Sequence, residues 1–346
     1  MKVGLEANHL PGNTTRSRPE TFRLAKALGF EGVFYKTVLD LSPTLDPGEL
    51  AELKQLADEL GLYLECGVSR VNPYNTAESP EIRAVGGGDY RLGIERMILA
   101  ARAIGCTELW AECATSANKP YPGYFSVDRF RTDVTWADQL VAIEKFLRLL
   151  APLLRNVGSR LCVETHEEIT SYEVVRLVEA VGPDVVDILF DSGNVVNRGE
   201  DPLAVARRVA PYTHMTHLKD PLLTFHPQGL VRHTYPCGLG SIDWRAVLSA
   251  LGEHQPHLHL TLEDHKGVLP IPVYDPVWQS HHPDLNTVEL AELFRLAYRN
   301  EERIRRGETP DPAVYEPIPS AQQWRERLDQ SQSHLRQIIA ELGFND

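Results

Sequence analysis

A chain of 346 residues with 42% hydrophobic and 24% charged side chains is long enough for one large core or for two smaller domains. Its formal net charge of −13 argues against nucleic acid as the partner, because phosphate binding requires clustered lysines and arginines. The five cysteines show no CxxC spacing, and neither a secretory leader nor an apolar stretch of membrane-spanning length is present, so we expect a cytoplasmic protein that does not contact a membrane.

The first half of the chain alternates short strand-like segments with longer helix-like segments. The predicted strands are 3–7, 32–38, 62–68 and 109–113, and the predicted helices are 19–28, 46–60, 89–104 and 135–154. Pro19 and Asp46-Pro47 suit the first turn of a helix, and Gly105 suits the residue that follows one. This alternation is typical of parallel strands joined by helices.

The second half repeats the scheme. A short strand lies within 160–166, further strands are predicted at 185–190, 214–218 and 257–262, and helices at 171–181, 202–209, 243–251 and 286–306. Eight such units within 1–307 predict a (β/α)8 TIM barrel, closed by the helix 286–306, and no GxGxxG motif supports a dinucleotide-binding sheet. Residues 308–346 read as a Pro-rich link and a C-terminal helical extension over 321–342, packed outside the barrel or on another subunit of a homo-oligomer.

Three long loops are predicted after strands, on the barrel face that carries active sites: 72–88, 114–133 and 220–242. Aromatic side chains occur in and near these loops. They either cover the barrel mouth or contact a flat part of a substrate, and they are Tyr74, Tyr121, Tyr124, Phe125, Tyr274 and Trp278.

Four consecutive strand ends carry carboxylates or an imidazole, in Val163-Glu164-Thr165-His166, Phe190-Asp191-Ser192-Gly193-Asn194, His217-Leu218-Lys219-Asp220 and Leu262-Glu263-Asp264-His265. In a barrel these ends converge, and three close carboxylates would repel one another without a cation. The set suits Mn²⁺ or Mg²⁺, with Co²⁺, Fe²⁺ or Zn²⁺ as alternatives. Taken singly, Asp191 could instead cap the following turn, and His217 could be an ordinary buried histidine.

The order Glu, Asp-x-Gly-Asn, His-x-Lys-Asp, Glu resembles the xylose isomerase-like TIM barrel superfamily of sugar isomerases and epimerases. The resemblance covers about 1–305 and includes the turn Gly238-Leu239-Gly240-Ser241-Ile242-Asp243. It implies a small carbohydrate substrate and one divalent metal ion bound by Glu164, Asp191, His217 and Glu263. In the ketose 3-epimerase branch, the residues matching Glu164 and Glu263 also move a proton on either face of the substrate.

One departure from that branch concerns the residue three positions after the aspartate, which is usually histidine and here is Asn194. Asparagine can hold a hydroxyl but cannot exchange a proton near neutral pH. His166 is well placed to act as a base, or to hold a ligand by a hydrogen bond. The side chains expected to contact substrate are Asn194, Lys219, His233, His265 and Glu112. Lys36 and Glu65 are alternatives for hydroxyl contacts, unless they form salt bridges with Glu112.

These features predict a metal-dependent isomerase or epimerase of a sugar or sugar derivative, working through an enediolate with Glu164, Glu263 and His166 as catalytic groups. An alternative is a lyase that eliminates the aglycone from a 3-oxo-glycoside, because the sequence also resembles C-glycoside deglycosidases, which use a metal ion and a nearby histidine. Two further alternatives are an apurinic endonuclease-like enzyme, against which the net charge of −13 argues, and a sugar-binding protein without catalysis.

Overall fold

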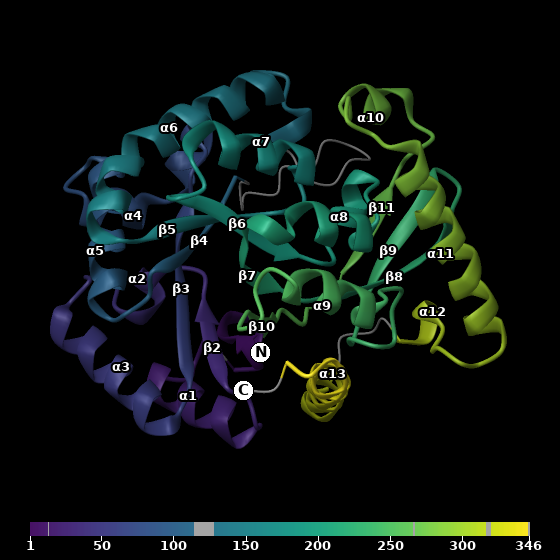
Figure 1. The fold of residues 1–346 in the computed structure, drawn as a ribbon, viewed down its shortest axis with the longest axis horizontal. Helices are drawn as coiled ribbons and strands as arrows, with labels where there is room; N and C mark the ends of the chain where they lie inside the picture. The colour runs from purple at the N-terminus through teal and green to yellow at the C-terminus, as the bar shows by residue number, and fades with distance from the viewer. Residues whose placement is uncertain (13, 114–127, 266, 316–319, 345–346) are drawn as a thin grey trace.

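The computed structural model describes every residue except 13, 114–127, 266, 316–319 and 345–346. Eight parallel strands form one sheet in the order β10-β1-β2-β3-β4-β5-β6-β7 (Figure 1). A parallel bridge between Leu218 and Leu262 joins β7 to β10, so the sheet closes into the predicted barrel. The strands are β1 (Lys2–Glu6), β2 (Gly32–Tyr35), β3 (Tyr63–Arg70), β4 (Glu108–Glu112), β5 (Arg160–Glu164), β6 (Val186–Asp191), β7 (Thr213–His217) and β10 (His259–Leu262).

Helices surround the barrel, and the predicted elements lie within a few residues of those observed. The surrounding helices are α1 (Arg18–Ala27), α3 (Pro47–Leu60), α5 (Tyr90–Ala103), α6 (Trp136–Val157), α7 (Ser171–Val181), α8 (Pro202–Val209), α9 (Trp244–Gly252) and α13 (Ala321–Leu342). The turn chemistry explains their bounds. The Asp46 carboxylate caps α3 by accepting hydrogen bonds from the amides of Gly48 and Glu49, and Gly158, with φ of 66°, ends α6 in the left-handed conformation.

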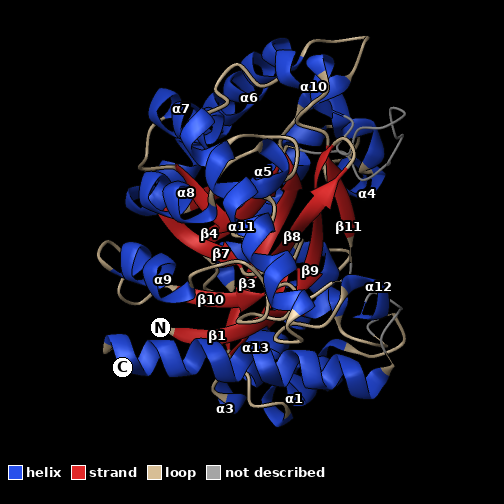
Figure 2. Ribbon diagram, turned by 90° about the vertical axis from the view of Figure 1, so that its right-hand side faces the viewer, coloured by secondary structure: helices blue, strands red, loops and turns tan. Residues whose placement is uncertain are grey.

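The helix that completes the ring is α13, and the prediction that 286–306 does so is wrong. Helix α11 (Thr287–Arg305) packs on strand β8, and its Glu289 contacts Tyr172 of α7 and Arg208 of α8, whereas α13 packs against α9 and β1 (Figures 1 and 2). Leu335 and Ile339 of α13 are buried in the main core. The carbonyl of Phe344 accepts a hydrogen bond from the amino group of Met1 at 2.7 Å, so the two ends of the described chain meet.

A second, antiparallel sheet of three strands lies beside the barrel, in the order β11-β9-β8. It is formed by β8 (Asp220–His226), β9 (Gly229–Tyr235) and β11 (Val268–Ile271), so the prediction of a loop over 220–242 is wrong. Gly229 turns the hairpin with φ of 140°, a conformation that favours glycine. We call β8, β9, β11, α10 (Pro276–Ser280) and α11 the side lobe (Figure 1).

The other predicted loops also hold structure where they are described. The range 72–88 contains a 3-10 turn and α4 (Pro80–Val85), and two more short helices are α2 (Val38–Leu41) and α12 (Pro312–Tyr315). Among the aromatics proposed for the barrel mouth, Tyr74 and Tyr274 are exposed and Trp278 is buried. Tyr121, Tyr124 and Phe125 lie outside the described residues. Within the described ranges, no helix combines the length and apolar character needed to cross a membrane.

The floor of the barrel mouth is apolar. Phe34, Trp110, Cys162, Leu189 and Met215 come from five different strands and form a buried cluster that is separate from the main core. Side chains that fill a barrel in this way leave no pore, so polar groups just above them are largely excluded from water.

Candidate metal centre

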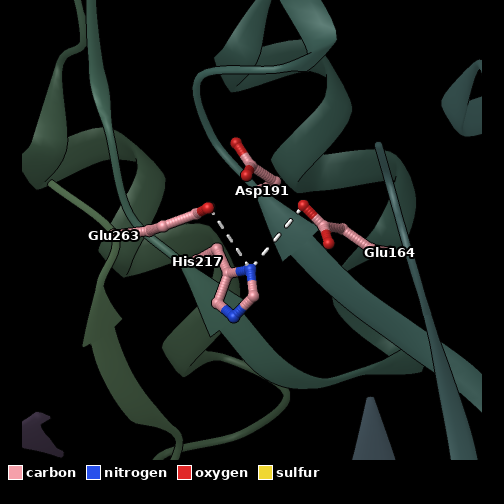
Figure 3. A group of neighbouring side chains, drawn as sticks. All are labelled: Glu164, Asp191, His217 and Glu263. Atoms are coloured by element: carbon pink, nitrogen blue, oxygen red, sulfur yellow. Dashed lines mark ion pairs between the residues drawn. The ribbon is translucent and has the colours of Figure 1, made fainter. Parts of the chain in front are cut away.

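Four side chains meet at the carboxyl ends of four adjacent strands (Figure 3). Glu164, Asp191 and His217 are the last residues of β5, β6 and β7, and Glu263 follows β10 directly. Each offers a ligand atom, and these atoms all lie within 4.8 Å of one another. The exposed fractions of the residues are 2%, 0%, 0% and 4%, so their charges are almost completely desolvated.

His217 lies between two carboxylates. Its Nδ1 is 3.6 Å from Glu164 Oε1 and 3.5 Å from Glu263 Oε2 (Figure 3), and the Phe34 ring packs against it edge-on at 4.6 Å between centroids. Neither ring nitrogen of His217 has a hydrogen-bond partner in the described chain, although both are buried. A buried imidazole of this kind is costly unless another group, such as a metal ion, uses its lone pair.

The carboxylate of Asp191 serves two purposes. Its Oδ1 accepts hydrogen bonds from the amides of Gly193 and Asn194 at 2.8 and 2.9 Å, so it does cap the following turn. Its Oδ2 lies 2.9 Å from both the Asn194 side-chain amide and the Lys219 ammonium. Burial raises the pKa of Asp191 to about 7, which Lys219 opposes and Glu164 and Glu263 reinforce. The repulsion among these carboxylates indicates a site built for a cation.

Both oxygens of each glutamate are already engaged. Glu164 accepts hydrogen bonds from Trp110 Nε1 at 2.6 Å on Oε2 and from Asn194 Nδ2 at 3.2 Å on Oε1. Glu263 Oε2 lies 2.5 Å from the Lys219 ammonium, and its Oε1 lies 3.4 Å from that of Lys36. Burial disfavours the ionised form of Glu263, but Lys219 and Lys36 outweigh burial and hold its pKa well below the usual range. Every carboxylate oxygen of the two glutamates thus has a partner that fixes its position.

The residues expected to contact substrate divide into two groups. Asn194, Lys219 and His265 adjoin the centre; His265 Nε2 is 3.2 Å from Lys219 Nζ and 3.9 Å from Glu263 Oε1. Glu112 ends β4 beside Arg70, with 3.4 Å between Oε1 and Nε. Burial raises the pKa of Glu112, against the opposing charges of His166 and Arg70. Glu112 therefore lies at the same end of the barrel as the centre, near His166.

His233 and Glu65 are not brought to the centre. His233 lies in β9 beside Thr224, with 3.1 Å between Nε2 and Oγ1, and both line a cavity of about 620 Å³ that residues of α11 and α12 also border. Glu65 lies near the start of β3, not at its end, and its carboxylate contacts His259 and Thr261. The predicted contact of His233 with substrate therefore has no support from its position.

Arg232, the neighbour of His233, points the other way because side chains alternate along a strand. Its Nη1 donates to the carbonyl of Gly193 and to Oδ1 of Asn194, both at 3.0 Å. Only 1% of Arg232 is exposed, and its Nη2 is 3.7 Å from Glu167 Oε1. No sequence pattern indicated this arginine, because the hairpin that carries it was not predicted.

His166 holds a partner of its own. Its Nδ1 is 2.5 Å from Oε2 of Glu168, which is fully buried, and 22% of the His166 side chain is exposed. Burial disfavours the imidazolium, but Glu168 and Glu164 outweigh it and raise the pKa of His166 well above its usual value. The carboxylate fixes the ring so that Nδ1 is engaged and Nε2 faces away from it.

A matching pair, missed in the sequence, stands at the end of β1. Glu6 is the last residue of β1, and its Oε2 contacts Nδ1 of His9 in the turn that follows. His9 Nδ1 is also 3.8 Å from Glu263 Oε1, and Lys36 Nζ is 3.7 Å from Glu6 Oε1. The strand-end rule applied to the first strand would have found Glu6.

The Asp of the His-x-Lys-Asp motif has a structural role. Asp220 accepts hydrogen bonds from the amides of Gly238 and Ile242 and from Trp244 Nε1, at 2.8, 3.1 and 2.9 Å. A Cβ at Gly240 would lie 2.2 Å from Asp220 Oδ1, which explains that glycine. The motif therefore fixes the turn before α9 through Asp220, while its His217 and Lys219 lie beside Glu263 in the cluster of carboxylates.

Comparison with known proteins agrees with this arrangement. Residues 22–295 match the family model described as xylose isomerase-like TIM barrel. Among curated relatives, the chain is 28% identical over 124 residues to the uncharacterized protein YihM of Escherichia coli K12, 23% identical over 235 residues to 3-oxo-isoapionate decarboxylase of Pectobacterium atrosepticum, and 33% identical over 92 residues to inosose dehydratase of Lacticaseibacillus casei. These alignments cover 35%, 67% and 26% of this chain, and span 38%, 72% and 30% of the relatives' lengths.

Solved structures share the fold. The 3-keto-D-glucoside 4-epimerase YcjR of E. coli superposes with a TM-score of 0.55 at 16% identity, over 85% of this chain and 99% of that one. The IOLI protein with a bound zinc atom superposes with a TM-score of 0.54 at 16% identity, over 88% of this chain and 98% of that one.

Proposed function

This chain belongs to the xylose isomerase-like TIM barrel family, and from that premise we propose that it is a metal-dependent lyase acting on a keto-sugar or keto-polyol. The lyase would enolise the ketone and then expel an oxygen substituent from the carbon one position further along. The names of the relatives support a ketone-bearing substrate. One is a 3-oxo-isoapionate decarboxylase, one an inosose dehydratase, and YcjR acts on a 3-keto-D-glucoside.

One divalent metal ion, which we propose to be Mn²⁺, would be held by Glu164, Asp191, His217 and Glu263. When bound, it would polarise the ketone and stabilise the negative charge that develops on its oxygen. The unpartnered nitrogens of His217 and the three converging carboxylates fit such an ion.

The position of His166 carries the proposal. Its Nδ1 is held by Glu168, while the oxygens of Glu164 and Glu263 are engaged by Trp110 and by the two lysines. His166 Nε2 is therefore better placed than either glutamate to take the proton from the carbon next to the ketone, and a cation on Glu164, one of the carboxylates that raise the pKa of His166, would favour the neutral imidazole that this step needs. Asn194 can orient a hydroxyl but cannot carry this proton.

Polar groups around the rim would hold the substrate. Lys219, His265 and Asn194 adjoin the ligands, and Arg232 and Glu112 lie just beyond them. Because Lys219, Asn194 and Arg232 are almost fully buried, each would lose strong hydrogen bonds if a substrate hydroxyl were missing. That gives the site a means of selecting polyols.

The test is incubation of the Mn²⁺-loaded protein with inosose and with methyl 3-keto-D-glucoside in D₂O. We expect deuterium uptake next to the ketone in NMR spectra, together with an unsaturated ketone and release of water or methanol. His166→Gln should slow both by roughly 10²–10⁴-fold, whereas the exposed His254→Gln should change neither. Turnover that survives in His166→Gln would refute the assignment of the base.

A second candidate is the isomerase or epimerase expected from the sequence. Glu164 and Glu263 flank His217 at 3.6 and 3.5 Å, an arrangement that would suit proton transfer on two faces of a substrate. An isomerase or epimerase would incorporate deuterium while it inverts a carbon centre or moves the carbonyl group. The product would retain every oxygen atom of the substrate. Free ketoses such as psicose and fructose are the probes for this outcome.

A further inference from the structure

The site contains two glutamate–histidine pairs of the same design. In one, Glu168 holds Nδ1 of His166, and in the other Glu6 holds Nδ1 of His9. Both glutamates are at least 98% buried, whereas 22% and 30% of the two histidine side chains are exposed. In the described chain, neither histidine makes a hydrogen bond through Nε2. Each carboxylate therefore fixes the tautomer and leaves one nitrogen available at the barrel mouth.

The two pairs stand on opposite sides of the mouth. His9 follows β1 and His166 follows β5, and three barrel strands separate β1 from β5 in either direction around the sheet. The four ligands occupy one of these two arcs, on β5, β6, β7 and after β10. His166 is two residues from Glu164 at one end of the arc, and His9 is 3.8 Å from Glu263 at the other. A substrate on the metal centre would thus have an imidazole on each side.

Resting on the proposed function, we infer that Glu6 and His9 form the general acid of the elimination, paired with His166 as its base. His166 Nε2 takes the proton from the carbon next to the ketone, and the C–H electron pair forms the enolate. As the carbonyl re-forms, that pair becomes the new carbon–carbon double bond, the bond to the leaving oxygen breaks, and His9 Nε2 gives this oxygen its proton. One proton is taken and one is given, so no oxidant or reductant is required.

Glu6, His9 and Glu263 also lie close enough to hold a metal ion of their own. The Lys36 ammonium argues for the acid instead, since it lies 3.7 Å from Glu6 Oε1 and 3.4 Å from Glu263 Oε1 and already balances their charges. A second divalent ion would have to displace it. His9 is also the more exposed of the two imidazoles, as suits the group that releases the departing molecule to solvent.

The experiment varies the leaving group. Methyl and 4-nitrophenyl 3-keto-D-glucosides are given to the wild type, to His9→Gln and to Glu6→Gln, with His254→Gln as the matched control. A methoxide leaving group needs a proton and 4-nitrophenolate does not. We expect His9→Gln to slow methanol release by roughly 10²–10⁴-fold and nitrophenolate release by less than about tenfold. Deuterium uptake next to the ketone should persist, because the base is intact.

Three results would overturn the inference. Equal loss for both leaving groups would show that His9 has only a structural role, and unchanged methanol release would remove it from the reaction. Calorimetric titration with Mn²⁺ gives the third, since a fall from two bound ions to one in His9→Gln would make the pair a metal site. If the wild type neither exchanges deuterium nor eliminates, the proposed function fails as well; if it does both, only the role of His9 is at issue.

Discussion

Arg327 of helix α13 forms a buried, two-pronged salt bridge with Asp264, the residue that follows the proposed metal ligand Glu263. Nε of Arg327 lies 2.9 Å from Asp264 Oδ2, and its Nη2 contacts Oδ1. The two residues are 3% and 7% exposed. The residue range that matches the family ends at 295, so an arginine beyond it holds the strand end that carries a ligand.

Replacing Arg327 should therefore weaken metal binding. In Arg327→Ala, the Asp264 carboxylate stays buried without its partner, at a cost of about 3–5 kcal/mol in the free energy of unfolding, and Glu263 loses its support. We expect Mn²⁺ affinity, measured by calorimetry, to fall by roughly tenfold or more. Arg325→Ala breaks only an exposed pair with Asp329 on the same helix and should bind Mn²⁺ normally. Equal affinities in the two variants would contradict this role.

Metal binding should stabilise the protein. At a Mn²⁺ concentration of 100 times the dissociation constant, the free energy of unfolding should rise by about 2.7 kcal/mol, which raises the melting temperature, and chelator should reverse the change. His217→Ala should abolish the response because it removes the only nitrogen ligand of the four. The exposed Glu52→Gln on α3 is the control. An unaltered Mn²⁺ response in His217→Ala would place the ion elsewhere.

Because α13 serves as the eighth barrel helix, a substitution on its buried face should strongly lower the free energy of unfolding. Leu335 is fully buried in the main core, so Leu335→Ala should lower the free energy of unfolding by about 2–5 kcal/mol in urea titrations. Gln337, two residues on, is exposed, and Gln337→Ala should stay within about 0.5 kcal/mol of the wild type. A small effect at Leu335 would mean that α13 is only loosely attached.

Stability should depend on pH through Glu200. Burial raises the pKa of this carboxyl to about 7, although hydrogen bonds from Ser171 oppose the change. The folded chain then keeps a proton that the unfolded chain loses between about pH 4.5 and 7, so the free energy of unfolding falls as pH rises through that window. Glu200→Gln should flatten this fall, which is at most about 3 kcal/mol. Urea unfolding at pH 5 and pH 8 measures it, with the exposed Glu253→Gln as control.

Because side chains alternate along β9, substitutions of the neighbouring residues Arg232 and His233 should have different effects on KM. Arg232→Ala should raise KM for a keto-carbohydrate by roughly 10–100-fold, because Arg232 supports Asn194 at the rim and its loss leaves polar groups without partners. His233→Ala should leave KM unchanged, since His233 contacts Thr224 on the other side of the strand. The reverse result would show that the hairpin is turned the other way in solution.

The sequence was sufficient for the barrel and for four of its strand-end side chains. Hydrophobic periodicity located the strands, and the rule that parallel strands end on one face brought Glu164, Asp191, His217 and Glu263 together. The sequence could not show which of two amphipathic helices docks on the barrel, because α11 and α13 both present an apolar face. What distinguishes them is that α11 packs on β8, a strand that was not predicted.

The remaining errors have local causes. The turn Pro227-Gln228-Gly229 separates two apolar runs, but prolines in β8 and β11 obscure their strand character. Because the hairpin was not predicted, His233 was assigned to the site, whereas the structure places its neighbour Arg232 there. His9 was missed because it follows its strand by three residues, within a turn whose shape the sequence pattern does not reveal.

The position of α13 has a consequence for how the protein is made. On the ribosome, β1 is synthesised long before its partner β10 and before the helix α13 that packs on β1. The ring of strands and the cluster of Glu164, Asp191, His217 and Glu263 can close only after residue 263 has emerged, and the Arg327–Asp264 bridge only after α13 has emerged. A nascent chain would therefore pass most of its synthesis without the complete cluster, so the proposed metal ion would bind late in translation or after it.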